Sequence, residues 1–456
     1  MNNTPMGCLV WIAAMLLSGC GWADGANAEL KYSSQDMTDI TEEEVRAAQQ
    51  AWGNSIGDIG RVEVAGGDFE ARAGAFVDSL YALDFTDVLF KPTMAERIPF
   101  RTTRSGIVSY FVANAPAAFP EDVAHGGFAR KPWRGVRFEV AGNWLGPGAA
   151  LSMGHYIFTD MNDTEHIAEF SMAYVRDISK RLRIALHHSS FPFCGEEFVS
   201  SRSCNLPRAQ LDAHSVLRSA LPEEHKRRLQ AVGVTSNVVL NSEQTWGAGI
   251  IDLGNASAAE MHGQAVDFVE HSYAYSSTTP YHAPTPWIAP GCLFKPTKAR
   301  LRPFRTSLAG AVSYFVGHDA TFAEDHGFAL QPWIEVGFEP AGITQLTPLL
   351  TVTMGHYFFT ATDNTKHKAE FSLAFVPDAG NLVIALHHSS FPCCSTCGSA
   401  LQADAVADAS VSWAVATIFG GLSLSLLIIS IRMNYSKHRM SGSEPLLHAD
   451  VGHIAS

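Results

Sequence analysis

The sequence predicts an α+β fold: two tandem cone-shaped domains, each with helices packed on a curved antiparallel sheet, followed by a C-terminal transmembrane helix. Three observations support this. The chain repeats itself at an offset of 194 to 204 residues, each copy places helix-periodic segments before strand-like ones, and a 21-residue run without charge lies at 411–431. Helices first and an antiparallel sheet last is the layout of α+β domains.

The internal repeat shows in short motifs that recur in the same order. "LFKPT" begins at Leu89 and again at Leu293, and "IALHHSSFP" begins at Ile184 and again at Ile384. Between them both copies carry "PFRT", "VSYFV", "MGHY.FT" and "H.AEFS.A". Each copy has the length of one domain. The predicted boundaries are 41–194 for the first domain, 195–235 for a linker and 236–394 for the second domain.

The elements of the first copy follow from its pattern in chain order. Thr41 and Glu44 form a capping box, which predicts a helix directly after Thr41. Apolar residues from Phe69 to Leu80 share one helical face and predict a second helix. "LFKPT" predicts a short strand that proline ends, and "SGIVSYFVAN" has helical spacing. Strand-like segments separated by turn residues follow at 136–142, 149–160, 166–175 and 182–190.

Both ends of the sequence predict membrane targeting. Residues 1–28 have the apolar run and the small residues of a secretory signal peptide, although no Lys or Arg precedes the run. Two processing events are possible, cleavage after "GANA" or lipidation of Cys20 in "LSGC". The second apolar run, at 411–431, favours cleavage after "GANA". Residues 411–431 are long enough to cross a bilayer; a buried core helix is the alternative.

The charges around the apolar run predict its orientation. Two aspartates precede it and three basic residues follow it, so the positive-inside tendency places the tail 432–456 in the cytosol. We therefore expect a single-pass membrane protein of the secretory pathway with lumenal or extracellular domains. Import into a complex plastid stays open. Asn162 and Asn255 head glycosylation sequons on the lumenal side.

Composition narrows the class of protein. The formal net charge is −13 and the basic residues form no run, so we expect no nucleic acid partner. A hydrophobic fraction of 46% with 17% charged residues is ordinary for a folded chain and argues against disorder. Six cysteines beyond the signal region could form disulfides in an oxidising compartment: Cys194, Cys204, Cys292, Cys393, Cys394 and Cys397.

The repeated "HHSS" closes an apolar strand, and alternation alone does not decide which residues face a pocket. His188 and Ser190 share a face with Ile184, whereas His187 and Ser189 share the other. If the apolar face is buried, His188 and Ser190 line the pocket. A bulge near the strand end would exchange the two pairs. In the second copy both faces are apolar.

A His–Ser cluster of this kind admits four interpretations. Serine could be a nucleophile with histidine as base, but no nucleophile elbow is present. His155, His187 and His188 could bind zinc, although adjacent histidines on a strand point to opposite faces. The groups could instead hold a small anion or neutral molecule in an apolar cavity, or only satisfy one another at a sheet edge. Retention of the set in two diverged copies favours binding.

These motifs together resemble the iota-class carbonic anhydrases. That family is built on a calmodulin-kinase-association-type domain of the nuclear transport factor 2-like superfamily, and the resemblance covers both copies. It implies a cone-shaped α+β domain and reversible hydration of carbon dioxide to bicarbonate, a lyase activity. It also implies hydroxyl and imidazole chemistry without an obligatory metal, while assistance by zinc or manganese stays open.

The resemblance further implies the site residues. The family's bicarbonate-holding threonine corresponds to Thr93 and Thr297, and its tyrosine to Tyr110 and Tyr314. Its histidine and serine fall within two matching sets: His187, His188, Ser189 and Ser190, and His387, His388, Ser389 and Ser390. We hypothesise that an imidazole with a pKa near ~6.5 acts as the base for water, while the hydroxyls stabilise the developing anion.

Other functions of the same fold remain as alternatives. A non-catalytic ligand-binding or association module would use the same cone, because fold alone does not set function. An isomerase-like enzyme would need an acid deep in the pocket. Glu169 and Glu370 are the only candidates from the repeated motifs, and alternation places both outside the pocket. Pairing of the two domains with each other, or of two chains as a homodimer, stays open.

Overall fold

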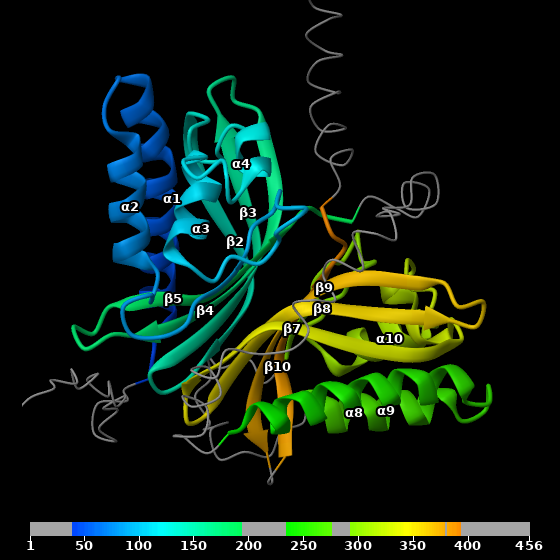
Figure 1. Cartoon of the computed structure of the whole chain (residues 1–456). Coiled ribbons are helices and arrows are strands. Elements are labelled where there is room, and N and C mark those ends of the chain that lie inside the picture. Colours follow the sequence, from blue (N-terminus) through cyan, green and yellow to red (C-terminus); the bar gives the residue numbers. More distant parts are fainter. Residues whose placement is uncertain (1–38, 194–233, 276–291, 379–380, 394–456) are drawn as a thin grey trace, which may run out of the picture. The chain divides into compact units, whose positions relative to one another are not determined.

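The structure is a computed structural model, which describes residues 39–193, 234–275, 292–378 and 381–393. Its described residues form two copies of one α+β unit, as the repeat predicts (Figure 1). Four predicted segments lie wholly or almost wholly outside them: the signal peptide 1–28, the linker 195–235, the apolar run 411–431 and the tail 432–456.

The described residues include two of the six cysteines, Cys292 and Cys393, and none of the predicted transmembrane run. No helix in these residues is long and apolar enough to span a bilayer. Cys292 is buried and forms no disulfide there, and burial raises the pKa of its thiol. The remaining predicted disulfide candidates except Cys393 lie outside the described residues.

The helices of the first copy begin where the sequence predicts. At the start of α1 (Glu42–Val64) the Thr41 side chain accepts from the Glu44 amide and the Glu44 carboxylate accepts from the Thr41 amide. The helices α2 (Phe69–Leu80) and α3 (Arg104–Val112) match the apolar periodicity. Figure 1 shows α1 and α2 alongside each other, and both contact β5. A short α4 (Pro120–Ala124) was not predicted.

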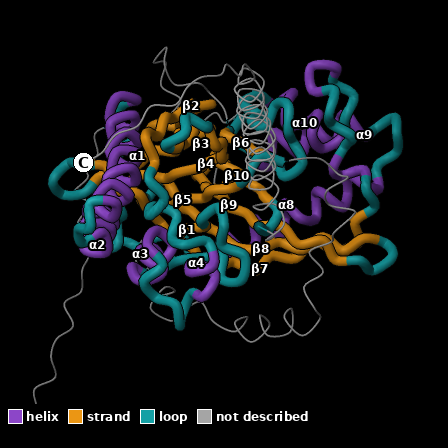
Figure 2. Tube along the Cα trace, turned by 90° about the horizontal axis from the view of Figure 1, so that it is seen from above, coloured by secondary structure: helices purple, strands orange, loops and turns teal. Residues whose placement is uncertain are grey.

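The sheet of the first copy has five strands in the order β1-β5-β4-β3-β2 (Figure 2). All neighbours pair antiparallel except β1, which joins the edge parallel to β5. The prediction of a purely antiparallel sheet is therefore wrong for β1. Its parallel pairing is possible because the chain passes through α3 between β1 and the other strands. The strands are β1 (Leu89–Lys91), β2 (Trp133–Leu145), β3 (Ala149–Asp160), β4 (Glu165–Arg176) and β5 (Leu182–Ser190).

The second copy repeats this arrangement with the sheet order β6-β10-β9-β8-β7. Its helical elements are α8 (Ser236–Asn255), α9 (Met261–Ser272), α10 (Leu308–Val316), η2 (Ala320–Phe322) and η3 (Phe328–Leu330). Its strands are β6 (Leu293–Lys295), β7 (Trp333–Thr347), β8 (Leu350–Ala361), β9 (Lys366–Asp378) and β10 (Asn381–Ser390).

The strands β3, β4 and β5 of the first sheet and β8, β9 and β10 of the second are largely buried on both faces. On the inner face of the first sheet, Trp52 of α1 stacks on Tyr156 of β3 with ring centroids 5.6 Å apart. On the outer face, Leu151 and Met153 belong to one apolar cluster with Val352 and Met354 of the second copy. Burial on both faces explains why β10 is apolar on both sides before its "HHSS".

Candidate functional site

A β-bulge decides which His–Ser pair faces the helices. Opposite β4, Leu186 pairs with Ala173 and Ile184 pairs with Tyr174, so Ala185 is an extra residue in β5. An extra residue reverses the alternation beyond it. His187 and Ser189 therefore lie on the inner face, and His188 and Ser190 lie on the outer face. Ala385 has the same effect in β10.

Three hydroxyls meet on the inner face of each copy. Ser189 Oγ is hydrogen-bonded to Thr93 Oγ1 and accepts from the Tyr156 hydroxyl. All three side chains are buried. In the second copy Thr297, Ser389 and Tyr357 make the same bonds. Neither Tyr156 nor Tyr357 was predicted as a site residue, although both lie in the repeated "MGHY.FT".

Tyr110 supplies a further hydroxyl from α3. Its ring stacks on Phe128 and contacts Phe90 edge-on, and its hydroxyl has no hydrogen-bond partner among the described residues. Burial raises the pKa of Tyr110, and the nearby Thr93 side chain only partly opposes this. Tyr314 lies on α10 in the second copy, and burial raises its pKa too. Both tyrosines are therefore neutral hydroxyl donors at physiological pH.

His187 lies among aromatic rings close to this cluster. Its ring stacks on Phe90 at 4.9 Å and meets Trp52 edge-on at 5.4 Å. Its Nδ1 lies 3.0 Å from the Tyr81 hydroxyl oxygen. That oxygen accepts a hydrogen bond from the Trp52 indole N–H at 3.1 Å. Burial lowers the pKa of His187 to about 3, and that of His387 likewise to about 3. Burial therefore disfavours an imidazole base with a pKa near ~6.5 at this site.

The second His–Ser pair binds the other copy. His188 is hydrogen-bonded through Nδ1 to Ser372 at 2.9 Å and through Nε2 to Ser390 at 3.0 Å. His388 makes the reciprocal bonds to Ser171 and Ser190, both at 2.9 Å. The four "HHSS" residues thus divide between two faces: one pair joins the hydroxyl cluster, and the other joins the two copies.

Two crossed ion pairs flank these histidines. Lys91 Nζ lies 2.9 Å from Glu370 Oε2, and Lys295 Nζ lies 2.9 Å from Glu169 Oε2. Each lysine also donates to a backbone carbonyl of its own copy, Lys91 to Ser189 at 3.1 Å and Lys295 to Ser389 at 3.0 Å. The contact between the copies therefore reaches the strand residues that carry the hydroxyl clusters.

The structure does not gather the histidines of the metal alternative. His187 lies on the inner face, whereas His155 lies on the outer face against the ring of Phe304, 4.9 Å away. Across the described ranges, no group of three His, Cys, Asp or Glu side chains has the spacing of a metal site. Ser189 also lacks an imidazole partner, because Nδ1 of His187 lies against Tyr81. The inner face of the first copy therefore holds no serine–histidine pair, and the serine–histidine bonds among the described residues join the two copies instead.

One buried acid was missed. Glu169 and Glu370 lie on the outer faces, as alternation predicts, but Glu243 of α8 lies on the inner face of the second copy. Its Oε1 accepts from Thr353 at 3.2 Å, its Oε2 has no partner among the described residues, and burial raises its pKa to about 8. Gln49 takes this place in the first copy, where it donates to Ser152.

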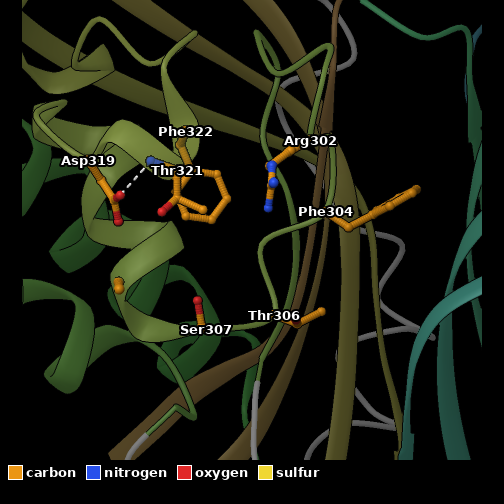
Figure 3. A pocket seen from close by; sticks show the side chains of 8 residues that line it. Arg302, Phe304, Thr306, Ser307, Asp319, Thr321 and Phe322 are labelled. Atoms are coloured by element: carbon orange, nitrogen blue, oxygen red, sulfur yellow. Dashed lines mark hydrogen bonds between the residues drawn. The ribbon is translucent and has the colours of Figure 1, made fainter.

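An open pocket of about 490 Å³ lies elsewhere on the second copy (Figure 3). Polar side chains from the segment before α10 and from the start of η2, among them Arg302, Thr306 and Asp319, line it. None of the predicted site residues borders this pocket. It is therefore separate from the hydroxyl clusters.

The inner-face cluster presents only neutral polar groups inside an aromatic shell. Hydroxyls can donate and accept in turn, so they can hold water, a small anion or a small neutral molecule and can pass a proton along. Apolar walls favour a small apolar substrate over water. The same arrangement occurs in both copies.

Comparison with known proteins finds one family that matches both copies. A family model described as metal-independent carbonic anhydrase matches residues 43–191 and 237–391. A metal-independent carbonic anhydrase from Nostoc sp. strain PCC 7120 is 40% identical over 157 residues, which cover 34% of this chain and 75% of that protein.

Solved structures similar to this chain were also found. A crystal structure of an iota-carbonic anhydrase from a cyanobacterium, complexed with bicarbonate, is 39% identical over 34% of this chain and 94% of that one, with a TM-score of 0.33. A calcium/calmodulin-dependent protein kinase II association domain from Xanthomonas campestris, itself described as putative, is 21% identical over 34% and 94%, with a TM-score of 0.23.

Proposed function

The chain belongs to the metal-independent carbonic anhydrase family, and on this premise we propose that each copy is a complete site for the reversible hydration of carbon dioxide to bicarbonate. The observation that carries this proposal is the buried hydroxyl cluster of Thr93, Ser189 and Tyr156, which the second copy repeats. Two sites in one chain would work in parallel.

Carbon dioxide would occupy the aromatic part of the inner face. The rings of Trp52 and Phe90 pack on His187, and Phe111 packs on both of them, without adding charge. Trp52 also stacks on Tyr156 of the hydroxyl cluster. An apolar wall holds carbon dioxide more readily than water. The shell therefore supplies binding, and the few polar groups supply orientation.

Water would be activated by the hydroxyls, because His187 is too weak a base. A water held by the Thr93–Ser189 pair can form the new C–O bond while one of its protons passes to a hydroxyl oxygen. Each hydroxyl accepts that proton as it releases its own, and the proton finally leaves to solvent. The pair of electrons displaced from the C=O bond becomes the negative charge of bicarbonate.

That charge would be stabilised by donors already in place. The Tyr110 hydroxyl lacks a partner among the described residues, as does Nε2 of His187. Preorganised donors in a dry site stabilise a developing anion much more strongly than water does, and one such donor is worth about 10²–10³ in rate. The chemistry then needs neither a metal ion nor an ionised side chain.

The test is stopped-flow hydration of carbon dioxide by the chain after exhaustive chelation. We expect turnover well above the uncatalysed rate and insensitive to the chelator. Turnover that disappears on chelation and returns with zinc or manganese would contradict the proposed mechanism. No turnover in either state would leave the ligand-binding module as the better function.

We also propose that the two copies pair within one chain. The reciprocal bonds of His188 and His388 and the crossed lysine–glutamate pairs support this, since every partner is buried and each contact occurs twice. Analytical ultracentrifugation that finds a monomeric chain with full activity would support this pairing. Activity only in a two-chain assembly would contradict it.

For localisation we propose a lumenal or extracellular enzyme anchored by residues 411–431. The uncharged run and the basic residues after it support this orientation. In sealed vesicles whose cytosolic face is on the outside, added protease should remove only the tail 432–456. Release of the protein by alkaline carbonate washing would contradict the anchor.

A further inference from the structure

Each site histidine is held by a chain of two buried aromatic side chains. In the first copy the Trp52 indole N–H lies 3.1 Å from the Tyr81 oxygen, and the Tyr81 oxygen lies 3.0 Å from His187 Nδ1. In the second copy the Trp246 to Tyr273 distance is 2.8 Å and the Tyr273 to His387 distance is 3.0 Å. All of these side chains are buried.

The direction of these bonds follows from the donor inventory. An indole nitrogen only donates, so the Tyr81 oxygen accepts from Trp52. The single Tyr81 hydroxyl hydrogen then has one remaining partner, Nδ1 of His187. If Nδ1 carried a proton and donated instead, the Tyr81 hydrogen would be buried without an acceptor, which is costly. Nδ1 therefore accepts.

We propose that Tyr81 and Tyr273 are positioning residues, which hold His187 and His387 as the neutral tautomer with its proton on Nε2. Each Nε2–H is then the donor offered to the oxygen of the forming bicarbonate. In both copies Nε2 is buried and has no partner among the described residues. This inference rests on the function proposed above, because it gives that reaction one of its anion donors.

The surrounding rings fix the orientation of the imidazole. The His187 ring stacks on Phe90 and lies nearly perpendicular to Trp52, and the His387 ring has the same contacts with Phe294 and Trp246. A ring flip would carry Nε2–H away from the reacting oxygens and would break the bond from tyrosine. Burial also keeps the ring neutral, because it lowers the pKa of His187 to about 3.

The test uses the full chain with nitrogen-15 in its histidines. Two-bond proton–nitrogen NMR spectra of the resting protein should show His187 and His387 neutral, with Nε2 protonated and Nδ1 bare. In Tyr81→Phe, His187 should shift toward the Nδ1–H tautomer while His387 stays unchanged. Tyr273→Phe should give the reverse result, so each copy is the control for the other.

Kinetics should follow the spectrum. In a Thr297→Val background, which leaves the first site as the only active one, Tyr81→Phe should lower kcat and kcat/KM together by about tenfold or more, because the lost donor acts on the transition state. Tyr174→Phe is the matched control: Tyr174 is buried in the same copy, and Phe375 naturally takes its place in the second copy. It should leave both constants unchanged.

Several outcomes would overturn the inference. A wild-type spectrum with protonated Nδ1 would do so even if Tyr81→Phe fails to fold. An unchanged tautomer and unchanged kcat in Tyr81→Phe would do so as well. If the expected spectra appear in a wild-type chain without hydration activity, the proposed function fails, and the catalytic role of the tautomer is overturned with it.

Discussion

The imidazoles of His188 and His388 stack face to face, with their centroids 3.9 Å apart and their planes 7° from parallel. They come from the two copies and meet on the outer faces of the two sheets. Burial lowers the pKa of each ring. The His388 ring further lowers the pKa of His188, and the nearby Lys295 further lowers that of His388. Two neutral rings can stack this closely, whereas two imidazolium ions would repel.

The charges of this contact lie instead in the crossed lysine–glutamate pairs. Lys91 is 1% exposed and Glu370 is 0% exposed, so water screens neither charge. We expect Glu370→Gln to destabilise the chain by about 3–5 kcal/mol, because it leaves a buried ammonium without its counterion. Lys91→Met combined with Glu370→Leu should cost clearly less. Urea unfolding of the three variants measures this.

The mirror pair supplies the control for that experiment. Lys295 and Glu169 have the same exposure and the same 2.9 Å separation, so Glu169→Gln should cost a similar amount. If both single variants unfold like the wild type, the two copies do not pair through these residues in solution.

Removing one threonine hydroxyl should inactivate only the site of its own copy. Thr93→Val should leave about half of the hydration rate, because the second copy still works. Thr93→Val with Thr297→Val should reduce the rate by about 10² or more, since Ser189 and Ser389 lose their relay partners. Thr306→Val, at the rim of the open pocket, is the control and should have no effect. Full activity in the double variant would refute the hydroxyl mechanism.

The pH dependence of hydration should lack an imidazole step. His187 has its pKa lowered to about 3, so the ring remains neutral throughout the range above about pH 5. In stopped-flow measurements kcat/KM should show no inflection near about pH 6.5, because that constant reports groups of the free enzyme. An inflection there that disappears in His187→Asn, measured in the Thr297→Val background, would restore histidine as the base.

Glu243 should make stability depend on pH. Its pKa rises from 4.5 to about 8 on folding, so the unfolded chain binds fewer protons than the folded chain between those values. The free energy of unfolding therefore falls as pH rises from about 4.5 to 8, by an amount on the order of 4–5 kcal/mol, and this contribution is constant outside that window.

Glu243→Gln tests this effect, because it copies Gln49 of the first copy. The variant should gain stability over the wild type as pH rises, with the gain levelling above about pH 8. Denaturant unfolding of both proteins across that range measures the difference. A difference that does not change with pH would show that the carboxyl ionises freely in the folded chain.

Local patterns in the sequence were sufficient for most of the fold. The capping box at Thr41 started α1, the apolar spacing from Phe69 to Leu80 gave α2, and alternation with turn residues located the strands to within a few residues. Each of these signals arises within one element, so no distant contact is needed to read it. The short helix α4 was not predicted, and the parallel pairing of β1 with β5 depends on the path of the chain through α3.

The candidate site was predictable only as a set of residues. Thr93, Tyr110, His187 and Ser189 were selected with His188 and Ser190, and the sequence does not separate the two His–Ser pairs. Tyr156 could have been predicted as well, because its motif "MGHY.FT" occurs in both copies. Glu243 was harder to predict, because the raised pKa of its carboxyl results from burial in the folded chain.

The sequence by itself determined the tandem repeat, the order of helices and strands, and the family, because motifs and periodicity are local and each was present twice. The tertiary structure decided which pair joins the site. That choice depends on the extra residue Ala185, and a bulge exists only when two strands are aligned against each other. It also decided the protonation of His187, since only folding brings Tyr81 to Nδ1 and takes the ring out of water.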